Sequence, residues 1–554
     1  MTRHTYDNLD HAKAEEAFDG LFHETKGGEM LLDSAGDGPV QSFVNSNKLP
    51  ECLSSAFHLV EGIEGIDRKM IVDSVLRGMQ EHKRMHGVLP GADVIVTALD
   101  QVKAHTASGK ELLQIDGVGN TEHHDPLGTQ PERIQMGILA QIAEAFPAAT
   151  YLPCEIGSNK ALLGIVGHRA LTATGEYAAK DSLDGIALGG TFLNSERRVT
   201  MTLGADRLSA TGALSLNKAG GSVKLLRNRT LVYINGFPMA EENTNYNTTP
   251  TQSSISGMVT LAGVEIGISG WVKPDTGEIS LTFTSALPAG TKVVGEGFLD
   301  YEADPSITPE LSTNVQTYAL YAHAWRGVMR QTIDSKTQYQ NELGIDLLSE
   351  SMMSSRNQLT VERHRSILRK AIDLGAANQD TFDFDYDGMM QQKTRAQIWQ
   401  DFTAILGNVD QQMAIDTMDR GITHLYVTKL IKAQWEALPS DLFEKSGLPS
   451  QPGIYRIGRL FGRFEVYYTP WELKEDEAAG TAQILCLGRS ATPARNSFVL
   501  GDAVPLIMLP LAVNSDLRYG QALYARNFTA VNPHQPSAKG AALINVTGLF
   551  KKAA

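Results

Sequence analysis

The chain has only three cysteines in 554 residues and contains no run of about 18 apolar residues. Cys52, Cys154 and Cys486 are far apart and odd in number, which argues against a disulfide framework and fits a reducing cytosol. We expect each thiol to be buried as a small hydrophobic group. No membrane span is expected. Residues 1–7 have no apolar stretch behind their basic residues, so they do not predict a signal peptide.

Basic patches are also missing. Lys and Arg number 49 against 63 Asp and Glu, which gives a formal net charge of −14. A protein that grips phosphates needs clusters of basic residues with aromatic residues between them, and the sequence has none. Mild acidity suits a protein that coexists with DNA without adhering to it, and it suits most cytosolic enzymes equally.

Enzyme and cofactor motifs are absent as well. The sequence has no Walker loop, zinc-protease motif, paired C-x-x-C or nucleophile elbow, and Gly117 and Gly119 follow no apolar strand. Residues 122–125 place three metal-capable side chains in a row, but neighbours on an extended chain point to opposite sides, which favours a polar loop. Residues 383–388 copy the start of a calcium loop, yet Thr394 occupies the position that needs a bidentate glutamate. We therefore predict a strand leading into a turn there, and no catalytic, cofactor or metal site.

Two groups of polar residues have ordinary structural explanations. The basic stretch 363–370 lies on a predicted helix and is expected to be its solvated face, or to pair with acids of a neighbouring subunit. His424 lies in an apolar strand and is expected to be a buried histidine with its hydrogen bonds satisfied.

A chain of this length predicts roughly two to four domains. Residues 1–50 are polar, rich in Gly and Asp and without clear periodicity, which is typical of a flexible arm. Residues 66–86 predict a helix that ends at Gly87, and Thr129 begins another with a capping-box spacing to Glu132.

The sequence pattern changes at about residue 196, where short strands begin to dominate. Short strands separated by Gly, Asn and Pro-Asp-Thr-Gly turns predict an antiparallel β domain with a polar loop over residues 241–254. The predicted strands are 198–203, 222–226, 230–234, 264–268, 278–283 and 292–296.

After Pro309 the chain becomes helical. Residues 345–375 predict one long helix, in which Leu348 faces the core and Glu350 faces solvent or a neighbouring subunit. A helix over 397–419, a strand over 422–428 and a helix over 429–438 then predict an α+β domain that the C-terminal strands complete.

Fifty residues near the C-terminus carry a resemblance to a known family. The ordered set of segments resembles the C-terminal end of the major capsid protein of T-even-type tailed bacteriophages. The segments are FEVYY at 464–468, QILCLGR at 483–489, VPLIMLP at 504–510, LRYG at 517–520 and ALINVTGL at 542–549.

The resemblance extends upstream. Residues 383–388, 398–413 and 419–428 are similar in order and spacing to the family's axial-domain segment, and residues 343–374 look like its spine helix. Residues 131–168 look like the segment before its extended loop, so the match covers about residues 130–195 and 300–550. The chain departs from the family pattern at His424 and in a fuller β region.

The resemblance implies an α+β, Hong Kong 97-type capsid fold with an N-terminal arm, an extended loop, a long spine helix, peripheral and axial domains, and an all-β insertion domain. The implied N-terminal divisions are a flexible arm that can serve as a cleavable propeptide (1–65), a helical region (66–130), and the N-arm and extended-loop segment (131–195). The β insertion follows (196–300). The remaining divisions are the peripheral domain with the spine helix (301–380), the axial domain (381–510) and the returning C-terminal strands (511–554).

The function that the resemblance implies is structural, not enzymatic. Hexamers and pentamers of the chain would form an icosahedral or prolate phage head in the virion, assembled in the host cytoplasm, that encloses double-stranded DNA without sequence-specific binding and without a membrane. The implied partners are scaffold, portal, vertex or decoration proteins and a prohead protease. That protease cleaves after Ile/Leu-x-Glu, a pattern that Leu59, Val60 and Glu61 fit.

Two alternatives stay open. One is a cytosolic two-domain enzyme with an acidic cleft, whose polar residues would be Asp383, Asp385, Asp387, His123 and His124. The other keeps the fold without the virus, as an encapsulin-type compartment or a capsid vertex protein.

Overall fold

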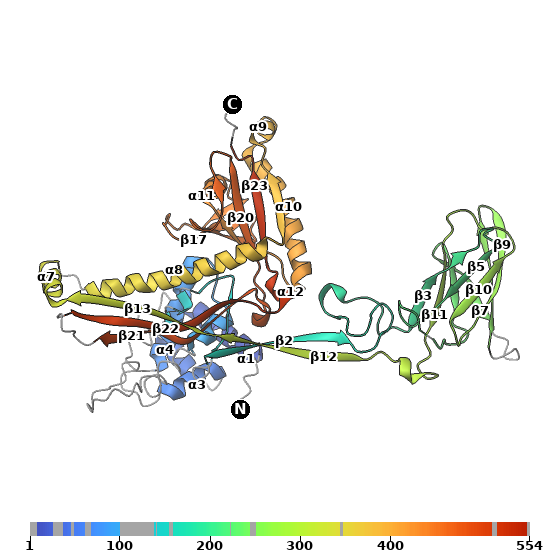
Figure 1. Ribbon diagram of the computed structural model, residues 1–554, viewed down its shortest axis with the longest axis horizontal. Coiled ribbons are helices and arrows are strands. Elements are labelled where there is room, and N and C mark those ends of the chain that lie inside the picture. The colour runs from blue at the N-terminus through green and yellow to red at the C-terminus, as the bar shows by residue number, and fades with distance from the viewer. Residues whose placement is uncertain are drawn as a thin grey trace. The chain divides into compact units, whose positions relative to one another are not determined.

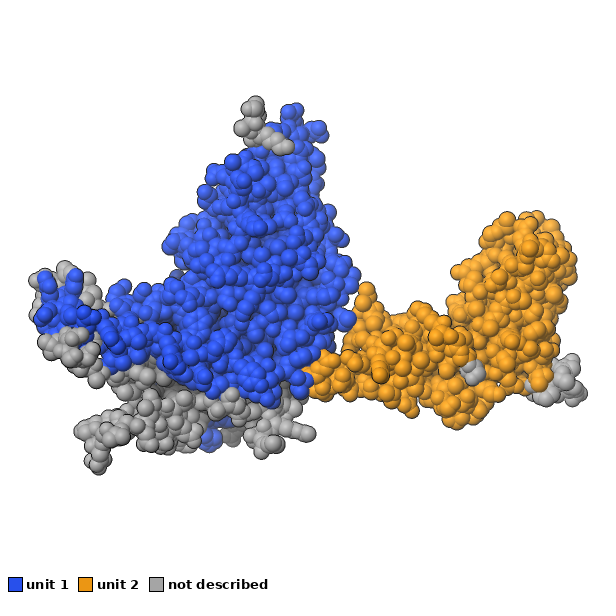
Figure 2. Space-filling view, in the orientation of Figure 1, with its two compact units in different colours: residues 1–165, 317–554 blue, residues 166–316 orange. Residues whose placement is uncertain are grey.

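The computed structural model combines helices and strands in two compact units, residues 1–165 with 317–554 (unit 1) and residues 166–316 (unit 2) (Figure 2). The described residues are 8–25, 37–45, 49–60, 68–99, 138–139, 141–143, 145–154, 159–221, 223–243, 251–343, 347–511 and 518–550. Within them, no helix combines the length and the apolar character needed to cross a bilayer.

The described part of residues 1–99 is helical. It includes α1 (Asn8–Glu24), α2 (Asp37–Val44), α3 (Glu51–Val60) and α4 (Arg68–His86). α4 confirms the predicted helix, and Gly87 follows it with a φ of +76°, the left-handed conformation that favours glycine after a helix. The predicted flexible arm is wrong over α1, because Phe18, Leu21 and Phe22 recur at helical spacing and are buried.

An eight-stranded sheet forms the centre of unit 1. The C-terminal strand β23 (Ala541–Thr547) lies between β14 (Gln379–Asp383) and β20 (Thr481–Leu487), so the chain end completes the sheet, as predicted. The order continues through β15 (His424–Val427), β18 (Phe464–Tyr468), β17 (Tyr455–Leu460) and β16 (Phe443–Lys445), and β19 (Glu475–Asp476) pairs with β20.

Each face of this sheet buries a different core, because successive side chains of a strand point to opposite faces. On one face, Leu425 and Val427 join α10 (Arg395–Thr417) and α11 (Lys429–Glu436) in a cluster that we call the axial core. On the other face, Tyr426 joins α8 and the N-terminal helices in a cluster that we call the N-terminal core. α10 begins with a capping box at Thr394 and ends at Met418, near the predicted bounds.

The long helix α8 (Leu347–Gly375) spans 29 residues, about 44 Å at 1.5 Å per residue. α7 (Ile333–Leu343) precedes it, and α8 runs along a four-stranded sheet (Figure 1). That sheet has the order β1 (Thr150–Tyr151), β21 (Phe498–Leu511), β22 (Arg518–Val531), β13 (His323–Thr332). Glu350 is exposed, as predicted, whereas residue 345 and the side chain of Leu348 lie outside the described part of the chain.

The two strands that carry the chain between the units pair with each other. They are β2 (Lys160–Ala170) and β12 (Leu311–Tyr321), which form a two-stranded sheet. In unit 1, Ala161 and Leu163 of β2 are buried beside Phe528, while Leu162 between them is exposed.

Unit 2 is built on a nine-stranded sheet that closes on itself. Met201 separates β3 (Glu196–Thr200) from β4 (Thr202–Leu203), and β3 pairs with β11 while β4 pairs with β5. One kinked strand therefore joins both ends of the sheet around a core of its own. The strands between are β11 (Val293–Phe298), β6 (Leu231–Ile234), β7 (Phe237–Asn243), β8 (Ser253–Leu261), β9 (Val264–Val272), β10 (Glu278–Phe283) and β5 (Ser209–Ala213).

Most predicted strands of this region are confirmed, with four differences. Residues 223–226 contribute only an isolated bridge between Leu225 and Leu299 instead of a strand. The sequence did not predict β5, which consists of small residues, β7, which contains Pro238, or β8, which begins inside the polar loop predicted over 241–254. Pro238 is accommodated because the β6–β7 register shifts beside it.

Candidate assembly surface and buried junctions

Two long consecutive strands lack any buried side chain. β12 alternates between exposed and half-buried residues along all 11 positions, and β13 has no buried side chain along its 10 positions. Strands in a folded domain normally bury one face. The exposed face of β12 carries no charged residue, since it consists of Leu311, Thr313, Val315, Thr317, Ala319 and Tyr321.

Large apolar side chains are exposed in unit 1 on β12, on β13 and on β2, the strand that pairs with β12. Leu162 on β2 is 58% exposed, Tyr321 on β12 is 64% exposed and Val328 on β13 is 59% exposed. β13 also forms the outer edge of its sheet, because β22 is its neighbour and no further strand follows in the described sheet order. Unpaired backbone groups along a long edge strand can pair with another chain. We call the exposed face of residues 317–321 of β12 together with that of β13, all of them in unit 1, the candidate assembly surface.

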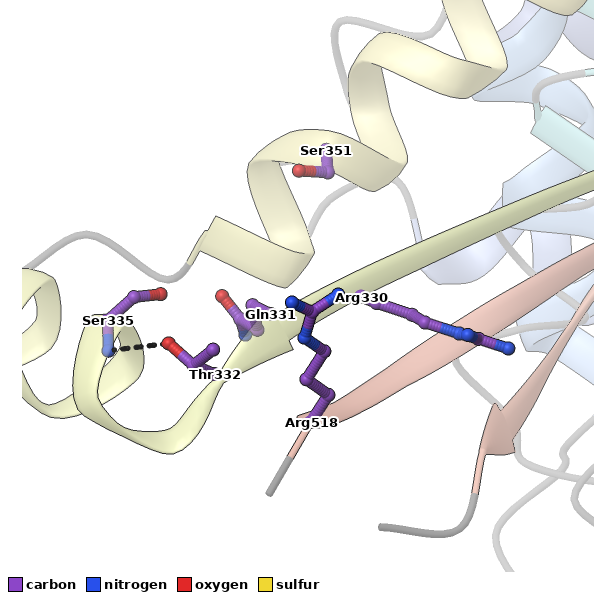
Figure 3. A pocket seen from close by; sticks show the side chains of 6 residues that line it. All are labelled: Arg330, Gln331, Thr332, Ser335, Ser351 and Arg518. Carbon is purple, nitrogen blue, oxygen red and sulfur yellow. Dashed lines mark hydrogen bonds between the residues drawn. The ribbon is translucent and has the colours of Figure 1, made fainter. Parts of the chain in front are cut away.

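A cavity of about 420 Å³ lies where β13 meets α7 and α8. Its lining is polar: Arg330, Gln331, Thr332, Ser335, Ser351 and Arg518 (Figure 3). The Arg518 side chain reaches from β22 toward Gln331, and the Ser335 amide donates to the Thr332 hydroxyl at 3.3 Å. These groups could bind an anion such as a carboxylate, but a serine needs an adjacent base to act as a nucleophile and the described lining offers none.

The basic stretch of α8 has its partners in the same chain. Arg363 forms an ion pair with Asp502 of β21 at 3.1 Å, and Arg365 and Arg369 both reach Glu472, at 2.7 and 3.1 Å. These cations hold the pKa of the Glu472 carboxyl below its usual range, chiefly through the hydrogen bond from Arg369. The predicted solvated face is confirmed for Arg369, whose side chain is 60% exposed, and is wrong for Arg363, which is 14% exposed because Asp502 of the same chain folds against the helix.

Four histidines meet between α4, α8 and the central sheet, and we call this cluster the histidine junction. His82 and His86 lie on α4 with ring centroids 4.5 Å apart, and the His86 Nδ1 is 3.0 Å from the Tyr467 hydroxyl. His364 on α8 bonds the Tyr426 hydroxyl through Nε2 at 3.2 Å. His424 on β15 bonds the Thr423 hydroxyl at 2.7 Å and packs 6.0 Å from the Tyr467 ring, which confirms a buried, hydrogen-bonded histidine.

Burial sets the protonation of this junction. It lowers the pKa of His82 to about 4 and the pKa values of His364 and His424 to about 3, and it holds the pKa of His86 well below its ordinary value. The phenols of Tyr426 and Tyr467 have raised pKa values for the same reason. At neutral pH the junction is therefore uncharged.

A buried aspartate and a half-buried arginine tie the N-terminal helices to the sheet beside this junction. Asp93 accepts from Arg489 at 2.9 Å, from the Thr150 hydroxyl at 2.9 Å and from the Tyr151 amide at 3.0 Å. Arg489 also donates to the Pro147 carbonyl at 2.8 Å. This set of bonds connects residues far apart in sequence and explains why the N-terminal region is packed rather than free.

The acidic turn has the structure that its sequence predicts. β14 ends at Asp383 and α9 (Tyr386–Met389) follows. Asp385 adopts a left-handed conformation with a φ of +42° and accepts from the Gly388 amide, while Asp383 accepts from Thr547. Among the described residues, no group of three or more His, Cys, Asp or Glu side chains has a metal-binding arrangement.

Other sequence-predicted residues fall partly outside the described chain. His123, His124 and Glu61 lie there, and the described helix α3 ends at Val60, directly after Leu59. Cys486 is buried, as expected, whereas Cys52 and Cys154 are only partly buried. The histidine junction was missed, although the four-residue spacing of His82 and His86 was a visible signal that both lie on one helix face.

Comparison with known proteins gives structural neighbours only. No family model and no curated protein matches the chain. The capsid of the jumbo bacteriophage PhiKZ matches with a TM-score of 0.36 at 10% identity, over 72% of this chain and 92% of that chain. The mature capsid of bacteriophage PhiM1 gives a TM-score of 0.29 at 11% identity over 56% and 90%, respectively. An encapsulin complex from Synechococcus elongatus gives 0.27 at 13% over 45% and 82%. At TM-scores this low the likeness adds no support to the function proposed next.

Proposed function

We propose that this chain is a shell-forming structural protein of the capsid type, which associates with further copies of itself and catalyses no reaction. The observation that supports this most is the candidate assembly surface. Its two strands bury no side chain in the single chain, although Leu162, Tyr321 and Val328 on and beside them are large and apolar.

Self-association supplies the burial that these strands lack. A two-stranded sheet such as β2–β12 is marginally stable alone in water, and it gains stability when another surface covers it. Each square ångström of apolar surface removed from water contributes about 25 cal/mol. An uncharged strand face imposes little desolvation cost, so covering the β12 face with a second copy is favourable.

The more specific assembly is a phage head of the T-even branch. In it, α8 is the spine helix, the eight-stranded sheet with α10 and α11 is the axial domain, and hexamers and pentamers of the chain enclose double-stranded DNA. The sequence resemblance supports this assignment, and the net charge of −14 suits a wall that holds DNA without adhering to it. Scaffold, portal, vertex or decoration proteins and a prohead protease would be the partners.

Cleavage after Glu61 would change the N-terminal core. It would remove α1, α2 and α3, whose Phe18, Phe22 and Leu53 are buried among the residues of α4. The cut therefore requires this core to open, either before cleavage or as its result.

The enzyme alternative finds no support in the described residues. Asp383 accepts from the Asp385 amide and the Thr547 hydroxyl, and Asp385 accepts from the Gly388 amide, so both carboxylates have structural hydrogen-bond partners. The encapsulin alternative differs from a phage head in its cargo rather than in its shell.

Electron microscopy of the purified full chain over a range of concentrations tests the proposal. We expect closed particles or six-fold capsomers, whereas a small compact oligomer at every concentration would contradict a shell. Nuclease-protected double-stranded DNA in particles from the native source distinguishes a phage head from a compartment filled with protein.

A further inference from the structure

We propose that the histidine junction is an acid-operated latch: protonation of its imidazoles drives α4 away from α8 and the central sheet, and opens the N-terminal core while the axial core stays folded. The inference does not depend on self-assembly, because every group involved lies within one chain. It rests on the contacts of four histidines and on the charges around them.

The junction suits neutral imidazoles only. His82 and His86 are neighbours on α4 with rings 4.5 Å apart, so two imidazolium ions there would be like charges in contact. The His82 Nδ1 lies 2.9 Å from the Ile142 carbonyl, but its Nε2 is buried without a hydrogen-bond partner among the described residues. The His364 ring has centroid distances of 4.5 Å to the Phe146 ring and 5.9 Å to the Tyr426 ring. Neither neighbour supplies a carboxylate for an imidazolium.

The fixed charges facing the junction do not compensate a proton. Arg489 lowers the pKa values of His82 and His424, and Arg456 lowers the pKa of His86. Two permanent cations therefore already oppose further positive charge. Asp93 is paired with Arg489. Glu465 on β18 is paired with Arg456 at 2.6 Å and also with Arg459.

One further carboxyl faces this region, that of Glu15 on α1. Its burial raises its pKa, with Asp19 as the second cause and Asp93 as the third, so its protonation on acidification removes a negative charge from this region. The phenols of Tyr426 and Tyr467 are also neutral throughout the acid range. Protons added to the histidines therefore meet Arg489 and Arg456 without any new negative charge.

The direction of the pH effect follows from the folded and open states. The folded junction holds the histidine pKa values far below the ordinary 6.5, so the closed state keeps its full stability above that pH. An opened junction takes up protons near pH 6.5. Closure is therefore lost as the pH falls from about 6.5 toward about 4, the folded pKa of His82.

The two cores differ in their sensitivity. Tyr426 and Tyr467, whose rings lie against His364, His86 and His424, belong to the N-terminal core, and α4, which carries His82 and His86, contributes its buried residues to the same core. Acid should therefore release the N-terminal helices first.

Two natural cysteines report the opening of the two cores separately. Cys52 on α3 packs against the N-terminal core, and Cys486 is buried in the axial core. The full-length unassembled protein is treated with dithiodipyridine, a thiol reagent active in acid, between pH 7.5 and 3.5, and the labelled cysteine is identified by peptide mass spectrometry. We expect labelling of Cys52 to accelerate by at least tenfold below about pH 6 while Cys486 stays protected, with a cooperative uptake of two or more protons.

Matched variants assign the effect to the junction. His86→Gln combined with His364→Gln keeps hydrogen-bond donors for Tyr467 and Tyr426 but removes two titrating groups. The pH midpoint of the Cys52 labelling transition should therefore fall by half a pH unit or more, and the number of protons taken up in that transition should decrease by about two. His323→Gln, an exposed histidine on β13, should change neither quantity. Should the double variant fail to fold, His364→Gln alone should lower the number of protons taken up by about one.

Three results overturn the latch. The first is simultaneous labelling of Cys52 and Cys486, which indicates global acid unfolding. The second is a wild-type transition that takes up fewer than two protons. The third is an unchanged midpoint and proton uptake in the histidine variants, which assigns the transition to carboxylates.

Discussion

Arg363 on α8 and Asp502 on β21 form an ion pair of 3.1 Å inside unit 1, where their side chains are 14% and 5% exposed. Asp502 also accepts from Gln141 at 3.0 Å. The pair holds the long helix against the long sheet, so both elements keep one register although α8 has no buried side chain among the described residues before Ile367.

Breaking this pair should be costly. Asp502→Asn leaves a buried guanidinium without its counter-ion, and we expect a loss of about 3–5 kcal/mol in the free energy of unfolding by urea denaturation. The control is Asp275→Asn, which breaks the exposed Lys224–Asp275 pair of unit 2 and should cost less than about 1 kcal/mol. Equal losses of unfolding free energy in both variants would show that burial does not make the Arg363–Asp502 pair more costly to break than an exposed pair.

Arg420 is expected to be irreplaceable even by lysine. Its guanidinium donates to the Gly488 carbonyl at 3.0 Å, the Ser497 hydroxyl at 2.6 Å and the Ser537 carbonyl at 3.0 Å. Burial lowers its pKa to about 10, so it stays charged at neutral pH. A lysine ammonium cannot match this planar fork, and Arg420→Lys should cost several kcal/mol, about 2–4, in thermal unfolding.

The control for that substitution is Arg77→Lys, at an exposed arginine of α4, which should change stability by less than about 0.5 kcal/mol. An Arg420→Lys variant with an unchanged melting temperature would contradict the role given to this side chain.

The closed sheet of unit 2 should be removable. The Leu299 amide donates to the Ser195 carbonyl at 2.9 Å, so the chain enters and leaves the sheet at adjacent points. Replacing residues 196–298 by a linker of about three glycines should leave the melting temperature of unit 1 within about 2 °C, measured by calorimetry.

A shorter deletion should do more harm. Removing residues 253–272 takes out β8 and β9 and leaves two open strand edges in a sheet that otherwise closes on itself, so we expect aggregation. Loss of the unit 1 transition in the longer deletion would show that unit 2 is needed for the fold of unit 1.

Long periodic elements were predictable from the sequence. α4, α10 and the described part of α8 follow apolar stripes, and Gly87 marks a helix end that needs a positive φ. α1 was missed because its apolar residues are few among charged ones, and β5 and β7 because Ala, Gly and Pro carry little strand signal.

The candidate site was less predictable, because it depends on contacts between distant residues. The basic residues of α8 gave no sign that Asp502 and Glu472 would fold against them. The histidine junction brings His82 and His364 close to His86 although they lie far apart in sequence, which no local pattern records. The exposed surface of β12 could not be recognised from the sequence. An alternating pattern of residues by itself predicts a strand with one face covered by its own chain.

The most direct test of the central claim compares two valines. Val328 on the candidate assembly surface is 59% exposed, and Val264 on β9 of unit 2 is 51% exposed, so aspartate at either position costs the isolated chain little. Particles of the wild type, Val328→Asp and Val264→Asp are counted by electron microscopy under identical assembly conditions, after matching melting curves confirm that all three chains are folded. The account predicts closed particles for the wild type and Val264→Asp, and a loss of at least tenfold for Val328→Asp. Normal particle yield from Val328→Asp would contradict it.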